Sequence, residues 1–128
     1  KDIRSKDGVL RSRAEHQAVN QTIQGCAADI LKIALTSAVK THLFEETGAF
    51  LVAPVYDEIT CSVPIRNLFE FCQRMRTIMN VTPPGHPVPM MAEFAIGPNW
   101  CDQTELGDNP SKRAIEATII EYGLERYL

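Results

Sequence analysis

Apolar residues recur every three or four positions through the first third of the chain. The series consists of Ile23, Ala27, Ile30, Leu31, Ala34, Leu35, Ala38 and Val39. This spacing predicts an amphipathic helix that runs to about His42. Thr22 is the expected N-cap of that helix, although a single helix that begins earlier also fits the pattern.

Two shorter apolar runs follow, and they predict a β-hairpin. Residues 49–55 and 59–63 are rich in aliphatic and aromatic side chains, and the first run comes directly after the Thr47-Gly48 break. Such short runs favour half-buried strands over helices, which would be too short to persist alone. Pro54 has no N–H to donate, so we expect it at a sheet edge or a bulge.

The remaining elements complete an α+β fold. Residues from Pro64 to about Met79 carry apolar side chains at helical spacing, and the proline-rich stretch 82–89 predicts a loop. Residues 90–96 alternate well enough to form a third strand beside the hairpin, and residues from Lys112 to about Tyr122 predict a further amphipathic helix. We therefore expect a small antiparallel sheet, made of the hairpin and a third strand, packed against helices.

Composition narrows the class of protein. The 128 residues are 45% hydrophobic, which is enough for one modest core, and no repeat or low-complexity segment marks a second domain. The four cysteines lack paired metal-ligand spacing, and neither a signal peptide nor a membrane-length apolar stretch is visible. We expect a reduced, cytoplasmic setting and no membrane partner.

The tetrapeptide Val55-Tyr56-Asp57-Glu58 places two adjacent carboxylates at the tip of the predicted hairpin. Carboxylates beside apolar strands are costly unless water, a cation or hydrogen-bond donors satisfy them. A metal-binding, phosphate-handling site is therefore one interpretation, and a solvated turn is the other. Because side chains alternate along a strand, one carboxylate is expected to be the inner ligand and the other a helper.

Polar side chains also gather on the predicted helix. His16, Asn20 and Gln24 are four residues apart, so one continuous helix would place all three on the same face. Amide groups at this spacing can contact a ligand. Gly25 disfavours a helix interior by roughly 1 kcal/mol relative to alanine, which indicates either a ligand close to the backbone or a tight helix crossing.

Taken in order, these motifs resemble the C-terminal part of family A DNA polymerases, the bacterial DNA polymerase I type. The resemblance covers roughly residues 1–103. The matching segments are Ala14-Glu15, Asn20, Ile23-Gln24-Gly25, Ala27-Ala28-Asp29-Ile30, Val55, Asp57-Glu58 and Ala95-Ile96-Gly97-Pro98-Asn99-Trp100. Five positions inside the motifs depart from the family pattern, which suggests a divergent, phage-derived member: His16, Thr22, Cys26, Pro54 and Tyr56.

The resemblance implies a catalytic role for the hairpin tip. Asp57 would be the palm aspartate that ligates a pair of Mg²⁺ ions during nucleotidyl transfer, and Glu58 would stand beside it. Tyr56 occupies the place of a family histidine next to the primer terminus, where its hydroxyl can reach a phosphate or sugar. The substrates implied are primer–template DNA and a deoxynucleoside triphosphate.

The resemblance also assigns DNA contacts to the helix. Asn20 and Gln24 match positions that touch the primer–template near its minor groove, where amide groups can bind with little sequence preference. His16 replaces a usual arginine, so its contact with the DNA backbone would be weaker. The net charge of −3 is unusual for a DNA-binding chain, but five cations gather at the N-terminal end, just before this helix: Lys1, Arg4, Lys6, Arg11 and Arg13.

Two parts of the family's active site do not occur in this sequence: the second metal-binding aspartate and the nucleotide-gripping finger helix. We therefore expect residues 1–103 to be a palm portion that needs an upstream polymerase portion for activity, and residues 104–128 to be a helical extension. A chain that begins at Lys1 reads as a fragment, a processed product or half of a split polymerase. The alternatives are a nonenzymatic DNA-binding or interaction module with a polymerase-like palm, and an inert fragment.

Overall fold

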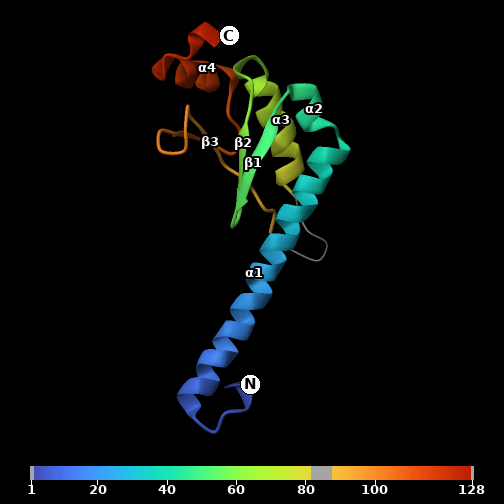
Figure 1. Cartoon of the computed structure of the whole chain (residues 1–128), viewed down its shortest axis with the longest axis vertical. Coiled ribbons are helices and arrows are strands. Elements are labelled where there is room, and N and C mark those ends of the chain that lie inside the picture. The colour runs from blue at the N-terminus through green and yellow to red at the C-terminus, as the bar shows by residue number, and fades with distance from the viewer. Residues whose placement is uncertain (1, 82–87, 128) are drawn as a thin grey trace. The chain divides into compact units, whose positions relative to one another are not determined.

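The computed structural model describes residues 2–81 and 88–127 (Figure 1). The chain forms two compact units, Lys1–Ile33 and Ala34–Leu128, and each is described by itself. A short 3-10 helix, Asp2–Arg4, precedes helix α1, Gly8–Lys40, which begins in the first unit and ends in the second. The predicted loop at residues 82–89 lies largely outside the described residues.

Helix α1 begins much earlier than its apolar series. The carboxylate of Asp7 accepts hydrogen bonds from the backbone N–H of Val9, at 2.8 Å, and of Leu10, at 3.4 Å, so Asp7 caps the first turn. The prediction that Thr22 is the N-cap is wrong. Its hydroxyl donates to the carbonyl of Ala18, one turn back, at 3.0 Å. Because no proline interrupts residues 8–40, the helix continues through this position.

In the second unit, α1 ends at Lys40, slightly before the predicted end. His42 takes a left-handed backbone conformation with φ of 54°, and the short helix α2, Leu43–Thr47, follows it. Ala34 and Ala38 are the buried residues of α1. Further toward the N-terminus, Ile30 and Leu31 are only partly buried, and Ile23 keeps 64% of its surface accessible. The predicted amphipathic face is therefore only partly buried.

The predicted hairpin is confirmed. Strands β1, Phe50–Val55, and β2, Glu58–Ser62, pair antiparallel, with a register shift between Leu51 and Ala53. Pro54 lies in β1, whose only paired neighbour among the described strands is β2, so this strand is a sheet edge as expected.

The predicted second helix is also confirmed, and it carries the main core. A 3-10 turn, Ile65–Asn67, leads into α3, Leu68–Met79. Phe71 and Met75 of α3 are buried together with residues of α1, α2 and the start of the hairpin. The other members of this first core are Ala38, Leu43 and Ala49. Figure 1 shows α3 running behind the hairpin, which it supports.

The third strand is shorter than predicted, and it does not join the hairpin's sheet. Strand β3, Phe94–Ile96, pairs antiparallel with β4, Thr104–Gly107, in a second two-stranded sheet. Met90, which was expected to start the strand, forms only an isolated bridge with Val81. The backbone N–H and C=O groups of β3 form their hydrogen bonds with β4 instead of with the hairpin.

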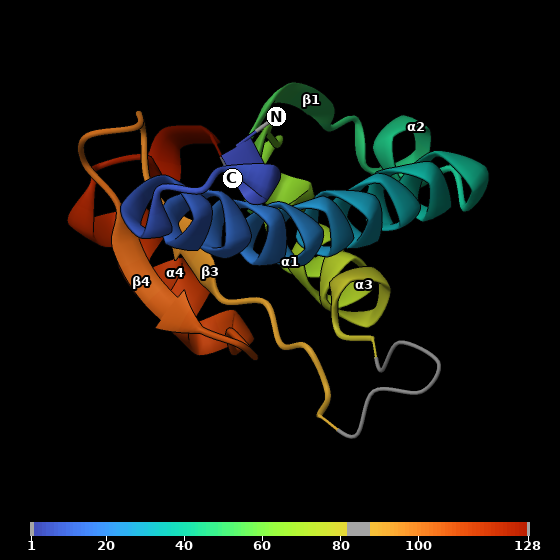
Figure 2. The same cartoon turned by 90° about the horizontal axis from the view of Figure 1, so that it is seen from below.

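The last helix, α4, Lys112–Glu121, agrees with its prediction and closes a second core. Ile115 and Ile119 of α4 pack against Leu68 and Cys72 of α3. Figure 2 shows β3, β4 and α4 close together. The fold class is therefore α+β, with two small antiparallel sheets packed against helices. No helix among the described residues has both the length and the apolar character needed to cross a membrane.

Candidate functional site

The acidic turn of the hairpin is fully presented to solvent. Val55 and Glu58 are the last paired residues, so Tyr56 and Asp57 alone make the turn. Tyr56 adopts φ of 54°, which is uncommon for a residue with a side chain, and it is 94% exposed. Asp57 and Glu58 are exposed as well. The hairpin therefore holds both carboxylates where a ligand can reach them.

The strand that follows the turn is anchored on the core. Ile59, Cys61 and Val63 alternate along the chain, and all three pack against the first core. Between them, the hydroxyl of Thr60 donates to the carboxylate of Glu58 at 3.2 Å. Glu58 is thus partly oriented by its own strand, whereas Asp57 lies in the turn. The division of the two carboxylates into a ligand and a helper stays a prediction.

The chemistry of Asp57 suits a hard cation, but it supplies only part of a site. Mg²⁺ prefers carboxylate oxygens in octahedral geometry and usually keeps several waters. Within residues 2–81 and 88–127, no group of three or more histidine, cysteine, aspartate or glutamate side chains is placed to hold a metal ion. Asp57 can therefore provide one oxygen ligand, but the described residues do not form a complete metal site by themselves.

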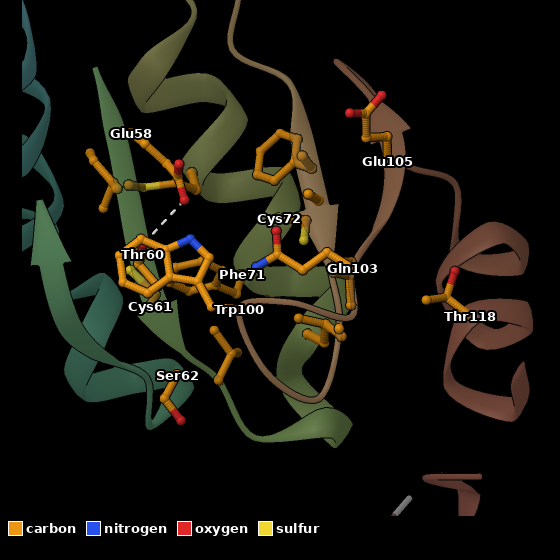
Figure 3. Close-up of a pocket in the computed structure, with 18 of the residues that line it drawn as sticks. Glu58, Thr60, Cys61, Ser62, Phe71, Cys72, Trp100, Gln103, Glu105 and Thr118 are labelled. Atoms are coloured by element: carbon orange, nitrogen blue, oxygen red, sulfur yellow. Dashed lines mark hydrogen bonds between the residues drawn. The ribbon is translucent and has the colours of Figure 1, made fainter. Parts of the chain in front are cut away.

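A groove of about 1120 Å³ runs between β2 and β3 within the second unit. Its lining includes the unbroken run 57–63 on one side and the run 91–100 on the other. Successive residues of a strand point to opposite faces, so a groove lined by all of them faces the strand's edge. Neither edge is paired there among the described strands. Figure 3 shows side chains of both walls, including Glu58 and Thr60 of β2.

The loop between β3 and β4 forms part of the groove wall. The side-chain oxygen of Asn99 accepts hydrogen bonds from the backbone N–H of Cys101, at 2.8 Å, and of Asp102, at 3.0 Å. Its amide nitrogen donates to the Asp102 carboxylate at 2.8 Å. These bonds define a tight turn that presents Trp100, which is 54% exposed, to the groove (Figure 3).

The three helix residues predicted to contact DNA lie in the first unit. His16, Asn20 and Gln24 are exposed and belong to α1. One uninterrupted helix puts them on one face at successive turns, as the first of the two interpretations required. The cations Arg11 and Arg13 belong to the same helix, and Arg11 pairs with Glu15 at 3.8 Å.

Gly25 lies in the middle of α1, and the helix crossing proposed for it is not found. Apart from its chain neighbours and the nearby backbone of α1 itself, no atom of the described residues lies within 4 Å of the position that a Cβ would take at Gly25. Helix packing in its unit therefore does not require a glycine at this position. The other interpretation, a ligand close to the backbone, stays a prediction.

Two cysteines line the groove and are kept protonated by burial. Desolvation raises the pKa of the Cys61 thiol from 9.0 to about 11 and that of Cys72 to about 12. Neither thiol is therefore a ready nucleophile or metal ligand near neutral pH. The chemistry of the groove rests on its carboxylates, its strand edges and its aromatic side chains.

Comparison with known proteins decides the family. The family model described as DNA polymerase family A matches residues 1–102, which include the helix face, the acidic hairpin and the Trp100 loop. This chain belongs to DNA polymerase family A. The match therefore confirms the resemblance that the motifs suggested.

Several curated relatives agree with this assignment. DNA polymerase I of Pseudomonas aeruginosa is 33% identical over 101 residues, covering 77% of this chain and 11% of that protein. DNA polymerase I of Geobacillus stearothermophilus is 33% identical over 101 residues, covering 79% and 11%. The thermostable DNA polymerase I of Thermus aquaticus is 29% identical over 104 residues, covering 81% and 12%. No solved structure matches the chain.

The polymerase chain described here thus spans only about a tenth of the length of the curated relatives it matches. The sequence predicted the acidic turn of the hairpin and the polar face of α1, but it did not predict the groove. The Gly-Pro-Asn sequence before Trp100 did carry a turn signal, since these residue types favour tight turns. No local signal, however, indicated that this turn would lie across from β2.

Proposed function

We propose that this chain is part of the palm of a DNA-directed DNA polymerase and acts in template-directed nucleotidyl transfer. The observation that carries the proposal is the exposed Asp57-Glu58 turn inside the segment that matches the family. Bound Mg²⁺ would supply charge stabilisation for the attacking and leaving oxygens. Asp57 would hold one or both ions through its carboxylate, and Glu58 would support the negative potential of the turn.

The proposed DNA contacts use α1. Asn20 and Gln24 offer amide groups, which can bind minor-groove acceptors that all base pairs share. His16 adds a polar contact to the DNA backbone through its ring nitrogens. Tyr56, next to Asp57, offers a hydroxyl for the primer terminus or the deoxynucleoside triphosphate. These roles are carried over from the family pattern onto exposed residues.

The missing metal ligands are proposed to come from another polymerase portion. The groove between β2 and β3 is a candidate binding place for that portion. Two strand edges face this groove, and neither is paired there with another strand among the described residues. An extended segment that enters such a groove can form backbone hydrogen bonds with both edges. A strand seated there would lie beside Glu58, so a carboxylate at its end could share a cation with Asp57.

The test is a reconstituted primer-extension assay. The full chain is mixed with a polymerase portion that carries the second metal aspartate and the finger helix, together with primer–template DNA, deoxynucleoside triphosphates and Mg²⁺. Asp57→Asn keeps the shape of the side chain but removes its charge, and we expect extension to fall by about a thousandfold or more. Glu121→Gln, an exposed change on α4, is the matched control and should leave the rate unchanged.

Two results would contradict the proposal. Normal extension by Asp57→Asn would show that the turn does not bind the catalytic metal. An inactive wild-type mixture, combined with DNA binding that is indifferent to Mg²⁺, would favour the alternative of a nonenzymatic DNA-binding module.

A further inference from the structure

The C-terminal residues build one wall of the groove, although they lie outside the family match. That match ends at residue 102, whereas β4 and α4 lie beyond it. Strand β3 has only three residues, and its paired neighbour among the described strands is β4. A strand this short does not persist without a partner. The position of β3 therefore depends on residues that the family model does not cover.

Several contacts fix this C-terminal segment to the rest of the second unit. Arg76 of α3 donates to the carbonyl of Asp108 at 3.0 Å, and Gln73 donates to the carbonyl of Pro110 at 3.1 Å. Pro110 is itself fully buried. The loop before α4 is thus held by side chains of α3, directly after β4 ends.

Helix α4 adds apolar contacts and a link back to β4. Ile115 is 2% exposed and packs in the second core with residues of α3, and partly buried Phe94 and Ile96 of β3 pack against that core. The hydroxyl groups of Tyr122 and Thr104 lie 3.1 Å apart, which joins the end of α4 to the start of β4. Helix α4 is therefore linked to β4 by a hydrogen bond and to β3 by core contacts, and β4 pairs with β3.

We propose that residues 104–124 act as a brace that holds β3 and the Trp100 loop in place before an extended polymerase segment enters the groove. Preorganisation of a binding site lowers the ordering entropy that is lost on binding. The identity of the segment rests on the proposed function above. The positioning of Trp100 by the brace does not, and it can be measured in the chain alone.

The first experiment uses Trp100, the only tryptophan of the chain, as a reporter. Ile115→Ala removes a core contact of the brace without changing the groove lining. We expect lower fluorescence anisotropy of Trp100 and about tenfold faster amide exchange in residues 95–103, with the hairpin unchanged. Leu43→Ala, an equally buried change in the first core, is the matched control and should lower the anisotropy less, because β3 contacts the first core through Phe94 but the second core through both Phe94 and Ile96.

A second, less destabilising variant keeps the test valid if Ile115→Ala unfolds the chain. Arg76→Met removes the hydrogen bond to Asp108 and keeps most of the aliphatic stem, so the chain should stay folded while Trp100 becomes more mobile. If Ile115→Ala and Arg76→Met fold cooperatively but leave Trp100 anisotropy and exchange as in the wild type, the brace does not position the loop and the inference is wrong.

The second experiment measures association of the full chain with the companion polymerase portion. If the brace preorganises the groove, Ile115→Ala should weaken this association by about tenfold, and Leu43→Ala should weaken it less. Equal affinities for wild type and Ile115→Ala would overturn the preorganising role. No association even for the wild type would instead contradict the proposed function, whereas the Trp100 measurements would still decide whether the brace positions the loop.

Discussion

Val55 and Glu58 form the last pair of the β1–β2 ladder, so the turn that bears Asp57 contains only two residues. Two-residue hairpin turns favour positive φ at one or both central residues, because their twist then matches that of the strands. Tyr56 meets this requirement with φ of 54°, although residues with a Cβ rarely adopt it. The turn thus combines an unfavourable backbone conformation with an exposed phenol beside a carboxylate.

We therefore expect Tyr56 to lower the stability of the turn, while its hydroxyl contributes to the proposed polymerase function. Tyr56→Asn places a residue that tolerates positive φ in the turn, and we expect the free energy of unfolding to rise by about 1 kcal/mol. Urea denaturation of the full chain measures the change. Tyr56→Phe keeps the backbone preference and should leave stability unaltered, so any loss of primer extension in that variant reports the hydroxyl. A lower stability for Tyr56→Asn would show that the phenol ring supports the turn.

Gly25 and Gly97 predict opposite outcomes for the same substitution. Gly25 has open space around its Cβ position, so Gly25→Ala should raise the free energy of unfolding by about 1 kcal/mol through helix propensity. If primer–template DNA approaches the backbone at this position, the added methyl group will also weaken DNA binding in the reconstituted mixture. Unchanged affinity in a titration with labelled DNA would remove the functional reason for this glycine.

At Gly97, by contrast, a Cβ would overlap the backbone carbonyl oxygen of Asp102. The turn held by Asn99 must then shift, and Gly97→Ala should lower the free energy of unfolding by about 1–3 kcal/mol. Thermal unfolding followed by circular dichroism measures this loss. A neutral result would mean that the β3–β4 loop relaxes freely, which its hydrogen bonds argue against.

The parts of the fold that sequence predicted are those that local pattern specifies. Apolar alternation located the hairpin, and helical periodicity located α3 and α4 to within one residue at their C-terminal ends. The start of α1 was missed because an earlier cap, Asp7, lies before a stretch with little apolar periodicity. Thr22 looked like a cap only because its hydroxyl can bond locally in either arrangement.

Long-range pairing could not be predicted in the same way. Strand β3 and its partner are short, and Thr104-Glu105-Leu106-Gly107 has no clear β signal of its own. Their pairing depends on burial of Phe94 and Ile96 beside α3 and α4, which local patterns do not encode. Similarly, the sequence indicated the acidic turn of the candidate site, but the groove beside it arises only when two separate sheets pack on α3.

The helix face of α1 gives a prediction about DNA binding. Asn20 and Gln24 are exposed, so replacing either by alanine should leave the free energy of unfolding nearly unchanged. In the reconstituted polymerase, each change should weaken primer–template binding by about 1 kcal/mol, to a similar extent for different sequences. Binding to several labelled duplexes measures this. Gln21→Ala, a neighbouring exposed change, is the control, and a loss confined to one sequence would contradict the proposed minor-groove contact.

The buried thiols predict how stability depends on pH. Burial raises the pKa of Cys61 to about 11 and that of Cys72 to about 12, from an ordinary value of 9.0. The unfolded chain therefore loses these protons first as pH rises. Their contribution to stability is complete below about pH 9 and declines between about pH 9 and pH 12.

Cys72→Ala tests this dependence. The variant should lose about 1 kcal/mol of stability at pH 7 through lost packing, but its stability should then fall less steeply than that of the wild type above pH 9. Denaturant titrations at neutral and alkaline pH measure both effects. Cys26→Ala, at an exposed position, should change neither. An alkaline decline as steep in Cys72→Ala as in the wild type would mean that this thiol does not control the transition, because deprotonation of other groups would then account for it.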